Sequence, residues 1–128
     1  MQRLFSVKPD TNKAILYYKK ARNYKLPRAS NNLAVLYLNA KMNEKEGKSD
    51  LTSTVESDAN IITYLEEAKE AGFSQAYYNL GSIFSKGLLS QKDSEKALAM
   101  FYEGSIKGDY KCKIKFAYEL MNQTSIMK

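Results

Sequence analysis

The sequence predicts an all-α fold, a right-handed solenoid of antiparallel helical hairpins, and three observations lead to this prediction. The nine residues from Tyr64 to Gly72 recur 36 positions later as Met100 to Gly108. The repeat continues beyond each glycine, where Ala76, Leu80 and Gly81 match Cys112, Phe116 and Ala117. The same internal spacing occurs 47 positions upstream, at Ala14, Ala21, Ala29, Leu33 and Ala34. A fixed period of this size is typical of stacked helical hairpins that bury their apolar faces against one another.

The first two helices are expected to form an antiparallel hairpin. The first begins at Asp10, whose side chain can accept hydrogen bonds from the N–H groups of the first turn. The second follows the turn at Pro27 and includes residues 32–38. Each helix carries a stripe of apolar or small residues at helical spacing, which we expect to be buried. The stripes are Ala14, Tyr17, Tyr18, Ala21 and Tyr24 in the first helix, and Ala29, Leu33, Ala34 and Tyr37 in the second.

Residues 41–57 interrupt the repeat, because they contain three apolar side chains in seventeen positions. So few apolar groups cannot offset the entropy that a segment of this length loses when it becomes ordered. We therefore expect a loop insertion over residues 41–57. The whole chain, residues 1–128, is expected to form a single repeat domain, either complete or as a fragment of a longer array.

Four further helices follow from local start and stop signals. The third starts at Asp58 and ends at Gly72, which suits a left-handed helix end. The fourth covers residues 76–84, the fifth begins at the capping residue Asp93, and the sixth covers residues 110–121. The residues of the third and fifth helices that we expect to be buried are Ile61, Ile62, Leu65, Ala68, Ala97, Leu98, Phe101 and Gly108.

Gly104 lies inside the fifth helix, where glycine costs about 1 kcal/mol relative to alanine. Close packing against a neighbouring helix is the expected compensation for this cost.

Composition argues against an enzyme. The chain has no histidine and one cysteine, so an internal disulfide and zinc sites of the Cys/His type are excluded. Cys112 occupies the repeat position of Ala29 and Ala76, which indicates a small core residue rather than a nucleophile. No group for acid–base or nucleophilic catalysis stands out, so we expect no catalytic site, no metal and no cofactor.

The expected location is the cytoplasm, since a single cysteine suits a reducing compartment. Residues 1–10 lack the apolar region of a secretory signal, and no apolar run approaches the roughly 20 residues that span a bilayer. Arg3 and Lys8 precede any acidic residue, so a mitochondrial location is an alternative. The lumen of the endoplasmic reticulum is another, if the chain is a fragment of a secretory-pathway protein.

Charge is unevenly distributed along the chain, whose net charge is +6. Residues 1–41 hold nine basic side chains and one acidic one, residues 42–75 hold three and eight, and residues 76–128 hold eight and five. Such a distribution can attract an acidic partner.

Three segments resemble the Sel1-like repeat, a relative of the tetratricopeptide repeat. They are Asn79-Leu-Gly-Ser-Ile-Phe-Ser-Lys-Gly87, Asp93-Ser-Glu-Lys-Ala-Leu-Ala-Met-Phe-Tyr102 and the closing Gly108. The resemblance extends over residues 76–108, and more weakly over residues 29–72, where Ala34 replaces a glycine. Residues 10–25 resemble a lone second helix and residues 110–121 a lone first helix.

This resemblance implies a non-enzymatic adaptor or scaffold whose first helices line a concave, peptide-binding face. Positions on those helices that would meet the ligand are Arg28, Asn31, Asn32, Gln75, Tyr78, Asn79, Lys111, Lys115 and Tyr118. In some tetratricopeptide domains an asparagine and two basic residues one turn apart grip a terminal carboxylate. Asn79, Lys111 and Lys115 match those positions, which implies an acidic or free-carboxylate peptide.

Two alternatives remain open at this point. Tyrosines beside lysines could stack RNA bases, although residues 42–75 are acidic. The tyrosines concerned are Tyr18, Tyr24, Tyr77, Tyr78 and Tyr110. The chain could instead be a structural subunit docked in a larger assembly.

Overall fold

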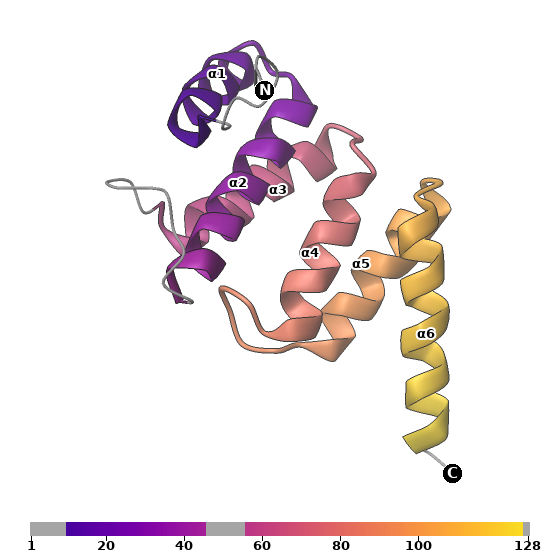
Figure 1. Cartoon of the computed structure of the whole chain (residues 1–128). Helices are drawn as coiled ribbons and strands as arrows, with labels where there is room; N and C mark the ends of the chain where they lie inside the picture. Colours follow the sequence, from indigo (N-terminus) through magenta and orange to yellow (C-terminus); the bar gives the residue numbers. More distant parts are fainter. Residues whose placement is uncertain (1–9, 46–55, 127–128) are drawn as a thin grey trace, which may run out of the picture.

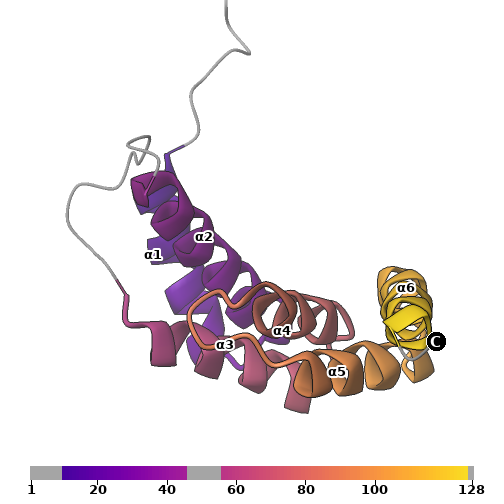
Figure 2. The same ribbon diagram turned by 90° about the horizontal axis from the view of Figure 1, so that it is seen from below.

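The computed structural model describes residues 10–45 and 56–126, and within them it contains six α-helices and no strand. The helices are α1 (Thr11–Asn23), α2 (Pro27–Lys45), α3 (Asp58–Glu70), α4 (Gln75–Lys86), α5 (Ser94–Ile106) and α6 (Tyr110–Ile126). Each helix packs against the next one along the chain, and α4 also contacts α2 and α6. The helices follow one another along a curved array (Figure 1), with α2, α4 and α6 in one row and α3 and α5 in the other (Figure 2). The predicted all-α repeat solenoid is confirmed.

The helix starts, and the ends of α3 and α4, lie close to where the start and stop signals predict them. The side chains of Asp10, Ser57 and Asp93 each accept a hydrogen bond from the backbone N–H three residues ahead, at 3.0, 3.1 and 3.0 Å. These bonds satisfy N–H groups that the first turn of a helix leaves without a partner. Gly72 and Gly87 follow α3 and α4 with φ angles of +91° and +69°, a left-handed conformation that glycine adopts without strain.

The core consists of two clusters that meet at α4. The first joins α1, α2, α3 and α4, and it includes the fully buried Leu33, Ile61 and Leu80. The second joins α4, α5 and α6 around Phe101 and Cys112, which are also fully buried. Because α4 contributes to both clusters, it fixes the two halves of the array relative to each other.

The buried face of α1 differs from the predicted stripe. Tyr17 and Tyr24 are 55% and 82% exposed, whereas Ile15 is buried and Tyr18 is half-buried. Successive helical residues are about 100° apart. The observed buried face, which contains Ile15, is therefore rotated by one residue relative to the predicted face, which contains Ala14. The prediction that Tyr17 and Tyr24 face the core is therefore wrong.

Three further details differ from the sequence-based expectations. α2 continues to Lys45, so the first five residues of the predicted insertion are helical; residues 46–55 lie outside the described residues. α6 continues to Ile126, five residues beyond the predicted end. Gly108 is exposed rather than buried. It lies in the turn that follows α5, where its φ angle is +96°.

Within the described ranges, no helix combines the length and the apolar character needed to span a membrane.

Candidate functional site

A chain of side-chain amides connects α2 to α4 in the row that was predicted to bind a ligand. Asn79 donates from Nδ2 to Oδ1 of Asn31 at 2.9 Å, and Asn31 donates to Oδ1 of Asn32 at 3.4 Å. Asn32 in turn donates to the hydroxyl of Tyr18 on α1 at 3.5 Å. Asn31 is only 2% exposed, so it holds Asn79 in place and cannot itself reach a ligand. Its predicted role as a direct contact is therefore wrong, whereas Asn32 and Asn79 are half-buried and accessible.

Cationic side chains lie over aromatic rings along the same row. Nζ of Lys111 on α6 is 5.5 Å from the centre of the Tyr78 ring on α4. Nζ of Lys115 is 5.6 Å from the ring of Tyr118, one turn further along its own helix. Such contacts contribute about 0.5–1 kcal/mol at exposed sites. The structure thus brings Lys111 over α4, while Lys115 stays above α6.

The two remaining predicted residues lie at the starts of their helices. The guanidinium of Arg28 is 5.6 Å from the ring of Phe73, which precedes α4. Gln75 is exposed in the first turn of α4. Neither residue is joined to the amide chain or to Lys111 by a hydrogen bond or ion pair in the described part of the chain.

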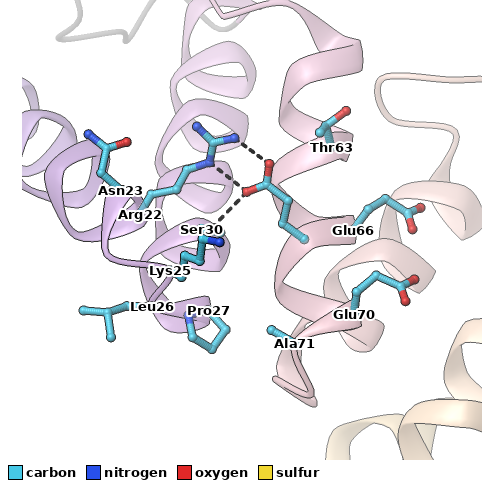
Figure 3. A pocket seen from close by; sticks show the side chains of 11 residues that line it. Arg22, Asn23, Lys25, Leu26, Pro27, Ser30, Thr63, Glu66, Glu70 and Ala71 are labelled. Carbon is cyan, nitrogen blue, oxygen red and sulfur yellow. Dashed lines mark hydrogen bonds and ion pairs between the residues drawn. The ribbon is translucent and has the colours of Figure 1, made fainter.

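A pocket of about 760 Å³ opens elsewhere, between the end of α1, the α1–α2 turn and α3 (Figure 3). Its lining residues are Arg22, Asn23, Lys25, Leu26, Pro27, Ser30, Thr63, Glu66, Glu67, Glu70 and Ala71. None of them was predicted as a site residue.

An ion pair between α1 and α3 crosses this pocket. Arg22 donates from Nε and Nη2 to the two carboxylate oxygens of Glu67 at 2.7 and 2.5 Å, and the Ser30 hydroxyl donates to the same carboxylate at 3.3 Å. The hydrogen bond from Arg22 lowers the pKa of Glu67, and the same bond raises the pKa of Arg22. Cζ of Arg22 also lies 4.8 Å from the centre of the Tyr64 ring. This arrangement fastens α1 to α3 and occupies the groups that could otherwise hold a ligand.

The other two carboxylates of the pocket pair with a lysine instead of approaching Arg22 and Glu67. Glu66 and Glu70 point away from Arg22 in Figure 3, and Lys69 pairs with both at 3.1 and 3.4 Å. Among the residues that the structure describes, no group of three His, Cys, Asp or Glu residues could hold a metal ion. Burial raises the pKa of the Cys112 thiol to about 12, so it remains protonated at neutral pH. The pocket and the cysteine therefore offer no arrangement for catalysis.

A family comparison identifies the repeat. Residues 2–23 and 74–109 match the model of the Sel1 repeat. These two segments are similar to Sel1 repeats. The second match spans α4 and α5 and confirms the resemblance predicted for residues 76–108, and the first includes all of α1. α2 and α3 lie between the two matches; there the structure forms a hairpin although the family model does not match.

A solved structure has the same fold. It is the crystal structure of a Sel1 repeat protein from Oxalobacter formigenes, which is 24% identical, with a TM-score of 0.65 over 86% of this chain. The chain spans 40% of the length of that protein. No curated protein matches the chain. Sel1-like repeats typically form protein-interaction scaffolds and are generally not catalytic.

Proposed function

We propose that the chain is a non-enzymatic adaptor that binds a protein or peptide segment on the face formed by α2, α4 and α6. The observation that carries this proposal is the contact of Lys111 with the Tyr78 ring, 5.5 Å away. This contact joins α4 to α6, as the bond from Asn79 to Asn31 joins α4 to α2. Three helices from successive repeats thus share one surface that a ligand could follow.

The preferred ligand is an acidic peptide, and its free terminal carboxylate would bind near Lys111 and Lys115. The charged residues predicted for this face are Arg28, Lys111 and Lys115, all basic, and none has an ion pair among the described residues. Because the two lysines are four residues apart, both ammonium groups can approach one carboxylate. Asn79 donates one of its two amide hydrogens to Asn31, which leaves the other for the ligand.

The test is a fluorescence-anisotropy titration with an acidic peptide that has a free C-terminal carboxylate. The Lys111→Ala/Lys115→Ala variant should lose at least tenfold in affinity, about 1.4 kcal/mol. Lys92→Ala/Lys107→Ala is the matched control, because it removes the same charge from exposed positions outside the predicted face. An equal loss of affinity in both variants would show that net charge alone attracts the peptide. Unchanged affinity of the Lys111→Ala/Lys115→Ala variant would contradict the proposed binding of the terminal carboxylate.

A single-stranded RNA in the same titration tests the alternative. RNA affinity that falls steeply with salt and exceeds the peptide affinity would replace the proposal. The positions of the tyrosines argue against that outcome. Tyr77 is buried and Tyr18 and Tyr78 are half-buried, whereas the exposed Tyr24 and Tyr110 lie at the first and last helices and do not form one stacking surface. Base stacking requires an accessible ring face.

A further inference from the structure

α6 has a second apolar face opposite the one that it buries. Cys112 and Phe116 pack toward the core, but four large apolar side chains on the other side are more than half exposed. These are Tyr110, Ile114, Tyr118 and Met121, at 66%, 62%, 56% and 69% exposure, here called the outer stripe of α6. Their spacing of four, four and three residues places them on one side of the helix. A helix that is apolar on two opposite sides is typical of an inner position between two packed neighbours.

The repeat register shows what covers this side elsewhere in the array. Ile114 corresponds to Tyr78 on α4 and to Asn31 on α2. Asn31 on α2 is 2% exposed and contacts Asn79 on α4, the next helix of its row. Tyr78 on α4 is half-buried and contacts Lys111 on α6, the helix that follows in the same row. In both cases one neighbour is a helix of the same row, although the Tyr78 ring also lies 6.1 Å from the ring of Phe101 on α5. The outer stripe therefore has the position at which this fold places another helix.

Charge distinguishes between possible occupants. On a helical projection Lys111 and Lys115 flank the outer stripe on one side and Lys113 flanks it on the other. None of the three has an ion pair among the described residues, and the first acidic residue of α6 is Glu119. Lysines on both flanks favour an occupant with acidic residues on both flanks of its apolar face.

A second copy of the chain does not offer such a helix. Exposed apolar side chains on α1 are Leu16 and Tyr17, and lysines at positions 13, 19 and 20 surround them. α3 is acidic, but no large apolar residue among its described side chains is exposed. α5 exposes Tyr102 and Ile106, but on a helical projection Glu103 shares its flank with two lysines, at positions 96 and 107, and the opposite flank has no acidic residue. Contact between copies would therefore bring like charges together or leave the stripe uncovered.

We propose that the outer stripe of α6 binds one amphipathic helix of a partner protein. The apolar face of that helix covers Ile114 and its neighbours, and acidic residues beside this face reach Lys111, Lys113 and Lys115. This inference rests on the proposed function, since Lys111, Lys115 and Tyr118 belong to both surfaces. It adds the form of the partner segment, a helix rather than an extended peptide.

The experiment selects partners from a yeast-displayed library of amphipathic helices with a fixed apolar face. Positions that flank this face vary among Glu, Lys, Gln and Ser, and the full chain is the bait. Selected helices should carry Glu at the flanks and should lose at least tenfold in affinity for the Ile114→Ser variant. Leu16→Ser is the matched control, because Leu16 is 51% exposed on α1 and Ile114 is 62% exposed. Affinity for this control should not change.

Several results would overturn the inference. They are a selection that yields no binder, binders with Lys at the flanks, and an equal loss in Ile114→Ser and Leu16→Ser. Light scattering that detects a dimer abolished by Ile114→Ser would assign the stripe to a second copy. Vesicles of phosphatidylcholine and phosphatidylserine that bind the chain but not Ile114→Ser would assign it to a membrane.

The carboxylate peptide separates the two proposals. If no helix is selected but that peptide binds through Lys111 and Lys115, the helix inference is wrong and the proposed function stands. If neither probe binds, both are wrong.

Discussion

Replacing Gly104 by alanine tests the close packing of α4, α5 and α6, because two effects of opposite sign compete there. Alanine inside a helix is favoured over glycine by about 1 kcal/mol. However, a Cβ atom at Gly104 would lie 2.8 Å from Cβ of Tyr77 on α4 and 3.0 Å from Cβ of Cys112 on α6, and closer still to the Cys112 sulfur. Carbon atoms pack optimally at about 3.5–4.0 Å. Because Cβ atoms are fixed to the backbone, relief requires whole helices to move.

Overpacking of a core costs about 1–3 kcal/mol, and two rigid contacts place Gly104→Ala at the upper end of that range. After the gain in helix propensity, the variant should be about 1–2 kcal/mol less stable than the wild type. Urea unfolding followed by circular dichroism measures this difference. Ala99→Gly, at an exposed position of the same helix, should lower the free energy of unfolding by about 1 kcal/mol. This variant measures the difference in helix propensity between alanine and glycine without a change in packing. A Gly104→Ala variant more stable than the wild type would refute the packing that the structure describes.

Four other predictions can be checked with the same protein. Leu80→Ala should destabilise the fold by about 2–5 kcal/mol, since Leu80 is fully buried, and a change below about 0.5 kcal/mol in urea unfolding would contradict this. Cys112, with a pKa of about 12, should resist iodoacetamide at pH 8 until the protein unfolds, and rapid labelling of the folded chain would contradict its burial. The pKa of Glu67 is lower in the folded chain than in the unfolded chain, where it is about 4.3. Ionised Glu67 therefore stabilises the fold at pH values above the unfolded pKa, and this stabilisation is lost as the pH falls through the pKa of the folded chain. Glu67→Gln should therefore lose less stability than the wild type between about pH 5 and pH 3, and an Arg22→Ala/Glu67→Ala cycle should give a coupling of about 0.5–1 kcal/mol because the pair is partly exposed.

The α4–α5 hairpin could be predicted from the sequence because two copies of the repeat constrain it. Ala76, Leu80 and Ala97 were assigned to the core by their matching positions, and each is at most 1% exposed. Gly81 shows why these residue types recur: an added Cβ would lie within 2.8 Å of ring atoms of Phe101. Where helices approach this closely, few side chains fit, so the sequence pattern is strong.

The orientation of α1 could not be predicted in the same way, because its sequence fits two adjacent faces. One contains Tyr17 and Tyr24, and the other contains Ile15, Tyr18 and Arg22. A charged residue such as Arg22 is normally expected on the exposed side of a helix. The structure turns it inward, since Glu67, 45 residues away, accepts two of its hydrogen bonds. A pairing over that distance in sequence leaves no local signal, and the pocket beside it was missed for the same reason.

The candidate binding face shows a different limit. Asn31, Tyr78 and Ile114 occupy one position of the repeat, yet the first is 2% exposed, the second is half-buried and the third is 62% exposed. Periodicity predicts the side of the helix on which a residue lies, but exposure depends on how closely the next helix of the row approaches. Asparagine suits the closest approach because its amide can bond to Asn79 across the interface. At the most open of the three positions, the apolar side chain of Ile114 is not covered by any part of the described chain. Exposed apolar surface favours burial against another molecule, so a partner is expected at α6 rather than at α2.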